Sequence, residues 1–242
     1  MVHTLPDWTT KYKLVNIFSN IDDAELAVRL GSVNRFDRRG WSWFYETFED
    51  TLVRWQLSGL GVGCAAALST VSSRSGKQSA LLTTGNAVDD WELIYTMLPY
   101  PPTTRFGYEI SFTLGTSIKS LELQLSFYTG SQWLISGIKV DVVGNTLQYV
   151  KPGPLYQTFK ASVPFYQNDY IFHTLKFVVD LSTLNYVRCL YDDMVMDMSS
   201  YSFGGIPDGT ARHMESQITV KNNAAGNHHC YLDDLIFTIE EP

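Results

Sequence analysis

The chain has 242 residues, of which 45% are hydrophobic and 14% aromatic, so it can bury a real core as one large all-β domain or as two small domains. Its formal net charge is -7 and no basic run occurs, which excludes the electrostatic footprint of a nucleic-acid-binding protein. No stretch approaches about 18 uninterrupted apolar residues, so we expect no insertion into a membrane.

The first forty residues read differently from the rest. Residues 1–20 have no clear period but are too apolar for a free tail, so we expect an extended arm that lies on a surface of its own or of a neighbour. Residues 22–30 begin with two acidic residues, carry Leu26 and Leu30 four positions apart and precede Gly31, which predicts one short helix. The sequence therefore predicts an arm over residues 1–40 and a folded domain over residues 41–242.

The arm also suggests partners. Arg38 and Arg39 lie in a charged turn, where they would pair with carboxylates of a neighbouring subunit or remain solvated. Residues 1–7 lack the positive start and apolar run of a secretory signal, so the signal has been trimmed or the protein is made without secretion. The residues that we expect at a subunit interface are Trp8, Tyr12, Phe18, Leu26, Leu30, Arg38 and Arg39.

From Trp41 onward the hydrophobic period is two, which predicts strands with one buried face and one wetter face. Residues 143–146 separate two such segments and predict a hairpin turn. Residues 152–168 contain three prolines and read as a long loop or an edge segment. The alternating segments cover residues 105–114, 121–128, 134–142, 147–150, 170–180, 186–191, 194–198 and 214–220.

The start and the finish of this domain carry a recognisable pattern. An aromatic strand ends in the acidic pair Glu49 and Asp50, residues 72–77 form a Ser/Gly/Lys loop, and residues 231–237 form a last strand with two aspartates. This pattern resembles lectin-like β-sandwich jelly rolls of the carbohydrate-binding-module, concanavalin A-like and laminin G-like kind. The resemblance implies an all-β fold of two stacked antiparallel sheets, in which the first and last strands pair.

Residues 170–198 carry a second resemblance. They are similar to a strand-turn-strand-turn-strand run of laminin G-like domains, whose second turn is usually Asp-Gly. Asp193 takes the place of the glycine here, which leaves the type of turn open.

The resemblance also implies one structural calcium ion. In such sandwiches an acid at the end of the first strand, a loop carbonyl and an aspartate of the last strand often bind it, and the matching positions are Glu49, the carbonyl of Lys77 and Asp233, with Asp234 beside it. Calcium takes six to eight hard oxygen ligands, which carboxylates and carbonyls supply. The alternative is that these carboxylates accept hydrogen bonds from loop amides and bind no metal.

The cysteines and the aromatic rings are two further groups of candidate functional residues. Cys64, Cys189 and Cys230 are odd in number and widely spaced, so we expect packed thiols and no disulfide framework or zinc site. Glycan stacking requires exposed rings, although most rings of such a chain lie in a core or an interface. The candidate rings are Trp91, Tyr128, Trp133, Tyr156 and Tyr166.

An enzymatic role finds little support in the sequence. Concanavalin-like hydrolases place closely spaced acids along one strand, and the nearest approach, Glu122-Leu123-Gln124, lacks the second acid. We therefore expect no enzyme.

The first hypothesis is an assembly protein, an auxiliary or decoration component of a virus particle, because residues 22–40 also resemble the leaders of phage-associated sandwich proteins and phage proteins need no secretion signal.

Two alternatives stay open. One is a carbohydrate-binding module or adhesin, and the other, less favoured, is a concanavalin-like glycan hydrolase. The expected partners are other subunits or particle proteins, bound through the arm, and surface glycans. The expected location is a virion or an extracellular surface.

Overall fold

The computed structural model of the protein describes residues 39–153 and 155–242, and residues 39–242 form one compact unit. Every regular element of this part is a β-strand, and it holds no helix with the length and hydropathy that a membrane crossing requires. The expected arm, its helix over residues 22–30 and the interface candidates Trp8, Tyr12, Phe18, Leu26, Leu30 and Arg38 lie outside the described residues. Arg39 is exposed, and its carbonyl accepts a hydrogen bond from Lys176 Nζ at 3.3 Å.

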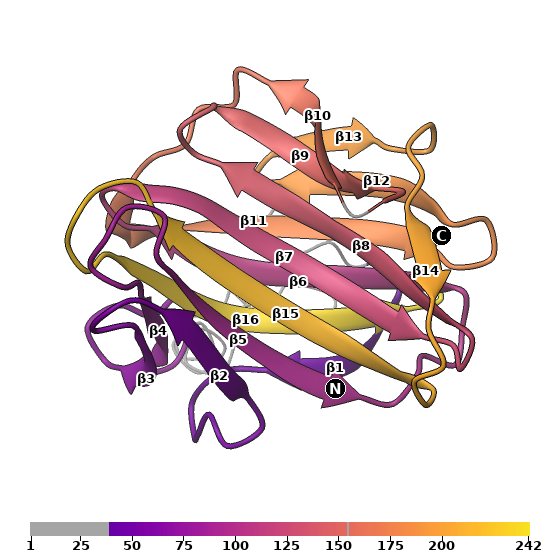
Figure 1. Cartoon of the computed structure of the whole chain (residues 1–242), viewed down its shortest axis with the longest axis horizontal. Helices are drawn as coiled ribbons and strands as arrows, with labels where there is room; N and C mark the ends of the chain where they lie inside the picture. Colours follow the sequence, from indigo (N-terminus) through magenta and orange to yellow (C-terminus); the bar gives the residue numbers. More distant parts are fainter. Residues whose placement is uncertain (1–38, 154) are drawn as a thin grey trace, which may run out of the picture. The chain divides into compact units, whose positions relative to one another are not determined.

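Within residues 39–153 and 155–242, sixteen strands form two antiparallel sheets, shown one in front of the other in Figure 1. Sheet A has the order β13-β12-β11-β6-β16-β4-β3, and β1 also pairs with β16. Its strands are β1 (Trp41–Glu46), β3 (Ala65–Ser69), β4 (Ser79–Thr83), β6 (Arg105–Leu114), β11 (Asn168–Asp180), β12 (Asn185–Tyr191), β13 (Met194–Asp197) and β16 (His229–Ile239).

Sheet B has the order β10-β9-β8-β7-β15-β5-β2, and β14 also pairs with β8. The front strands of Figure 1 belong to this sheet and cross the strands of sheet A at an angle. Its strands are β2 (Gln56–Leu60), β5 (Trp91–Leu98), β7 (Ile118–Tyr128), β8 (Gln132–Asp141), β9 (Thr146–Lys151), β10 (Leu155–Ala161), β14 (Gly204–Pro207) and β15 (His213–Asn222).

Alternating side chains of both sheets fill the core. In β7 the residues Leu121, Leu123, Leu125 and Phe127 are fully buried, and the residues between them point away from sheet A. The facing strand β6 buries aromatic rings, among them Phe106, which lies edge-on to Phe127 with ring centroids 5.8 Å apart. The predicted fold, two stacked antiparallel sheets with one apolar interior, is confirmed.

The expected pairing of the first and last strands is also confirmed. β1 pairs with the second half of β16, from Trp41 opposite Ile239 to Glu46 opposite Leu235. The hairpin at residues 143–146 joins β8 to β9, with Asn145 in the left-handed region at φ 52°. The three-strand run is β11, β12 and β13, and Asp192 adopts φ 49° in its second turn, because aspartate tolerates this conformation better than most side chains.

One buried tyrosine connects the two sheets. The single hydroxyl hydrogen of Tyr186 in β12 is shared between the carbonyls of Val150 at 2.9 Å and Gly137 at 3.1 Å, and the hydroxyl oxygen accepts the Gly137 amide at 2.9 Å. These atoms lie where the β8–β9 ladder opens beyond Ile138 and Tyr149. Tyr186 thus satisfies the backbone groups that the opening leaves unpaired.

The three cysteines are free thiols, as expected. Cys189 and Cys230 lie buried in β12 and β16, and Cys64 is partly buried just before β3.

Candidate functional site

The candidate site is the side of sheet B that faces away from sheet A, which we call the outer face of sheet B. Because successive side chains of a strand point to opposite sides, the residues that alternate with the buried leucines of β7 lie on this face. Strand pairing extends the face across neighbouring strands. It contains Trp91, Leu93, Tyr95 and Met97 of β5, Ser120, Glu122, Gln124, Ser126 and Tyr128 of β7, Trp133, Ile135, Gly137, Lys139 and Asp141 of β8, and His213, Glu215, Gln217, Thr219 and Lys221 of β15.

Side-chain amides occupy the centre of the face. Gln217 of β15 lies opposite Gln124 of β7, which lies opposite Gly137 of β8. The Gln124 amide donates to Ser126 Oγ at 3.3 Å and the Gln217 amide to Thr219 Oγ1 at 3.5 Å. Within residues 39–153 and 155–242, neither amide oxygen accepts a hydrogen bond. Both oxygens are therefore available to accept a hydrogen bond from a ligand.

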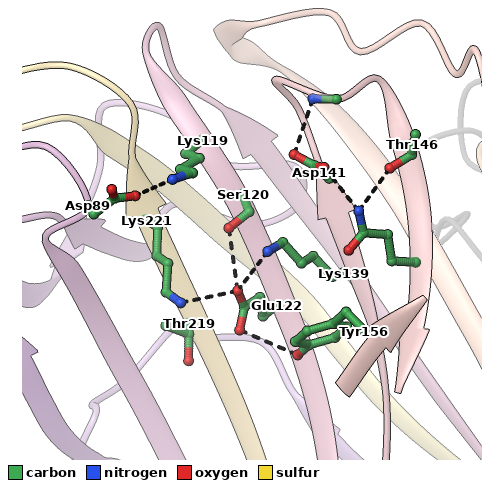
Figure 2. A network of polar contacts seen from close by, with 12 residues as sticks. Asp89, Lys119, Ser120, Glu122, Lys139, Asp141, Thr146, Tyr156, Thr219 and Lys221 are labelled. Atoms are coloured by element: carbon green, nitrogen blue, oxygen red, sulfur yellow. Dashed lines mark hydrogen bonds and ion pairs between the residues drawn. The ribbon is translucent and has the colours of Figure 1, made fainter. Parts of the chain in front are cut away.

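A charged cluster lies beside these amides, around Glu122, two residues along β7 from Gln124 (Figure 2). Lys139 Nζ and Lys221 Nζ each approach the same Glu122 oxygen, Oε1, to 3.4 Å. Ser120 Oγ donates to that oxygen at 3.5 Å, and Tyr156 donates its hydroxyl to Glu122 Oε2 at 3.3 Å. We call these five residues the Glu122 cluster.

Tyr156 reaches the cluster from the edge of the sheet. It belongs to β10 and pairs with Val150 of β9, and its hydroxyl contacts Glu122 of β7. The Lys139 ammonium lies over the same ring, with Nζ 5.3 Å from the ring centroid of Tyr156. Burial, and then the negative charge of Glu122, raise the pKa of Tyr156 well above 10, so the phenol remains a hydrogen-bond donor.

A second carboxylate of the face, Asp141, is held separately. Its Oδ1 accepts the Gly144 amide at 3.2 Å and its Oδ2 accepts the Gln148 side-chain amide at 3.0 Å (Figure 2). Gln148 also donates to Thr146 Oγ1 at 3.1 Å. Asp141 therefore stabilises the β8–β9 hairpin.

Three stacked rings close one end of the face. Tyr128 lies parallel to Trp133, with ring centroids 5.8 Å apart, and parallel to His213, with ring centroids 4.4 Å apart. Both faces of the Tyr128 ring are thus covered, and sugar stacking is open only to the outer rings of the stack. Burial, and then the charge of Glu215, raise the pKa of Tyr128 to about 12.

The structure brings four of the five predicted glycan-binding rings to one face, among them Tyr156 of the Glu122 cluster. Tyr128 and Trp133 lie together, whereas Trp91 is in the row of Lys221, eight residues along β15 from the row of His213. At about 3.4 Å per residue this is about 27 Å, so the rings mark two ends of the face. Tyr166 lies in the loop between β10 and β11, away from this face, and its carbonyl accepts a hydrogen bond from the buried His173 of sheet A at 3.1 Å.

Sequence reasoning missed Lys139, Lys221, Gln124 and Gln217 as site residues. The period-two alternation of β7, β8 and β15 assigns them to solvent-facing positions. They become neighbours through the register in which β7 pairs with β8 and β15. Hydrophobic alternation along each strand does not show which residues of two strands lie opposite each other.

The residues predicted to bind calcium lie around loop 72–78. Glu49 Oε1 accepts the amides of Lys77 at 2.8 Å and Gln78 at 3.2 Å. Gly76 adopts φ 62°, and a side chain there would collide with the Glu49 carboxylate, so this turn requires glycine. Glu49 therefore caps one side of the loop.

The two aspartates of β16 hold the other side of the loop. Asp233 Oδ2 accepts the amides of Arg74 at 2.7 Å and Ser75 at 3.0 Å. Asp234 accepts the Tyr45 hydroxyl and the Ser75 hydroxyl, each at 2.8 Å, and its Oδ2 lies 3.8 Å from Arg74 Nη1. Burial raises the pKa of Asp233 to about 6, against the loop amides, which lower it.

These contacts test how the predicted ligands fit calcium. In the part of the chain that the structure describes, no group of three or more His, Cys, Asp or Glu side chains lies close enough together to hold a metal ion. Glu49 and Asp233 instead accept loop amides, which was the alternative considered for them. Calcium binding therefore stays a prediction, and a melting temperature unmoved by chelator would contradict it.

No protein-family model and no curated protein matches the chain. Among solved structures, an endo-β-1,4-glucuronan lyase from the fungus Trichoderma reesei is 10% identical, with a TM-score of 0.54, and the match covers 82% of this chain and 95% of that chain. The cellulose-induced protein Cip1 is 13% identical, with a TM-score of 0.50, and the match covers 81% and 96% of the two chains.

Other matches have lower TM-scores. A structure described as one of the carbohydrate-binding modules from the β-sandwich superfamily is 12% identical, with a TM-score of 0.48, and the match covers 82% of this chain and 62% of that chain. The chain spans 18% of a matching sialidase. At these identities the likeness to the lyase and to Cip1 shows the fold alone, which is the lectin-like jelly roll that the sequence predicted.

Proposed function

We propose that this chain is a carbohydrate-binding module and that it binds its glycan along the outer face of sheet B. The observation that carries the proposal is the centre of that face, where Gln124 and Gln217 lie opposite each other on neighbouring strands and their amide oxygens have acceptor capacity left. Sugar hydroxyls need such convergent polar groups, and the stacked rings at one end and Trp91 at the other supply apolar surface.

The acids of the face support binding over hydrolysis. A glycosidase needs two carboxylates facing each other across the scissile bond, one acting as acid and the other as nucleophile or base. Here Glu122 is held by two lysines, Asp141 by Gln148 and the Gly144 amide, and Glu215 by His213 at 3.2 Å. Each acid thus has its own partners, and no pair of them is left to share a bond between sugars.

The assembly role expected from the sequence receives no support of this kind. It depends on residues 1–38, which lie outside the described residues, and no observation in the described part favours a virus particle. The virion role and the location that goes with it therefore remain predictions.

The test measures binding to a panel of soluble polysaccharides by affinity electrophoresis and calorimetry. We expect binding to at least one polymer and a loss of about tenfold or more in affinity for the double variant Gln124→Ala/Gln217→Ala, since two hydrogen bonds contribute roughly 1–3 kcal/mol. Gln132→Ala is the matched control, because Gln132 is an exposed glutamine on the opposite side of β8.

Three results would overturn the proposal. The first is no binding to any polysaccharide, and the second is binding that the double variant leaves unchanged. The third is release of shortened chains that Glu122→Gln abolishes, which would make the face a catalytic one.

A further inference from the structure

We infer that the glycan taken by the outer face of sheet B is acidic, and that a sugar carboxylate is bound between Lys139 and Lys221. The inference rests on the proposed function, because it names the ligand class of the same face. The observation behind it is the sharing of one oxygen, Glu122 Oε1, by two ammonium groups at 3.4 Å each.

The charges of the Glu122 cluster do not balance. Two ammonium groups and one carboxylate leave one positive charge, and the hydroxyls of Ser120 and Tyr156 add none. Two other carboxylates lie near this charge, and among the described contacts neither forms an ion pair with Lys139 or Lys221: Asp141 accepts the Gly144 and Gln148 amides, and Asp89 pairs with Lys119.

The two lysines approach Glu122 from opposite strands. Lys139 comes from β8 and Lys221 from β15, on either side of β7, so their ammonium groups converge over it (Figure 2). The lysine side chains are 20% and 33% exposed, and the Glu122 side chain is 14% exposed. Each ammonium has three donors, so N–H groups remain for a ligand that approaches from outside.

The carboxylate beneath them is fixed. Tyr156 donates to one Glu122 oxygen and Ser120 to the other, which restrains the anion that orients both lysines. A site arranged before the ligand arrives loses less side-chain freedom on binding.

Ligand charge then decides the energetics. A neutral sugar chain laid over this face would remove two ammonium groups from water with a single carboxylate between them, and burying an unbalanced charge is costly. A uronate sugar supplies the second negative charge and accepts charge-assisted hydrogen bonds from both lysines. The face therefore favours a polymer that carries carboxylates over its neutral counterpart.

The experiment compares two oligosaccharides of equal length, a β-1,4-linked glucose chain and the chain in which each C6 is a carboxylate, by calorimetry at low and moderate salt. We expect the intact protein to bind the carboxylate chain about tenfold or more tightly, and to lose that advantage as salt rises. Lys139→Gln and Lys221→Gln should each weaken binding of the carboxylate chain about tenfold and leave binding of the neutral chain nearly unchanged.

Two further variants sharpen the comparison. Lys119→Gln is the matched control, since Lys119 lies at the rim and pairs with the exposed Asp89 (Figure 2). Glu122→Gln keeps an oxygen that can accept from both lysines and removes only the competing negative charge, so it should strengthen binding of the carboxylate chain, and weaker binding would contradict the inference.

The outcomes separate the two proposals. If the intact protein binds the neutral chain as tightly as the acidic one, or if the Lys139 and Lys221 variants behave like Lys119→Gln, the inference fails and the carbohydrate-binding function stands. If the intact protein binds no polysaccharide at all, both fail.

Discussion

Two charged clusters of this molecule use the same residue types for different ends. Around loop 72–78, the carboxylates of Asp233 and Asp234 are buried and accept backbone amides and hydroxyls. In the Glu122 cluster, the carboxylate meets only side chains, and the two lysines remain partly exposed. The first arrangement fixes a loop to the last strand, and the second leaves donors on a surface.

The difference lies in what each carboxylate would leave behind if it were removed. Loss of a buried carboxylate leaves backbone amides without acceptors, which costs the full desolvation of those groups. Loss of a carboxylate between partly exposed lysines leaves ammonium groups that water can solvate. The loop cluster should therefore govern stability, and the Glu122 cluster should govern recognition.

The largest effect is expected at Asp233. Asp233→Ala leaves the Arg74 and Ser75 amides without their acceptor, and we expect a loss of about 2–4 kcal/mol in the free energy of unfolding, measured by urea denaturation. Asp197→Ala is the control, because Asp197 is exposed on β13 and accepts a single amide, that of Ser199. A loss at Asp233 no larger than that of the control would contradict the contrast between the clusters.

The next largest effect tests the support beneath the binding face. Tyr186→Phe removes the hydroxyl that satisfies Gly137 and Val150 from inside the sandwich, so we expect a loss of about 1–3 kcal/mol in the free energy of unfolding. Tyr201→Phe is a suitable control, since that ring packs in the same cluster beside Tyr149. Equal stability of the two variants would show that the β8–β9 opening needs no buried donor.

Much of the fold could be predicted from the sequence, because its signals are local. Alternation marked most of the strands, Gly144 and Asn145 marked a hairpin, and the aromatic-acidic start with the paired aspartates at the end indicated the closing contact. These features depend on neighbours in the sequence or on a known resemblance.

The site was harder to predict, because it is assembled by register. In the sequence, Glu122 is only part of an incomplete acidic motif. Nothing near it in the sequence indicates that Lys221 of β15 is its ion-pair partner. Tyr128 illustrates a second limit, since the sequence shows an aromatic residue but not that Trp133 and His213 cover both faces of its ring.

A smaller effect should follow pH through His173 of sheet A. This buried imidazole lies between two acceptors, Asp192 Oδ2 at 2.8 Å and the Tyr166 carbonyl at 3.1 Å. Burial alone would lower the pKa of His173, but these hydrogen bonds outweigh it and raise the pKa above 6.5. Because the folded state binds this proton more tightly, the stabilisation is present below about pH 6.5 and is lost as pH rises through the raised pKa.

Two buried acids change stability in the same direction. Burial raises the pKa of Glu92 to about 7 and that of Asp233 to about 6, so the folded state also favours their protonated forms. The measurement is therefore the difference between the intact protein and His173→Gln in urea denaturation from pH 5 to 8. We expect this difference to shrink as pH rises, and a constant difference would contradict a charged His173.

The smallest effect on stability is expected at Glu122, although it has four polar partners. Glu122→Gln should change the free energy of unfolding by no more than about 1 kcal/mol, because its ion pairs are partly exposed and the lysines regain water. Urea denaturation of this variant beside Asp233→Asn gives the same chemical change in both clusters. A loss at Glu122 that equals or exceeds the loss at Asp233 would mean that the Glu122 cluster holds the sheet together, and the surface charges would then no longer be free to select a ligand.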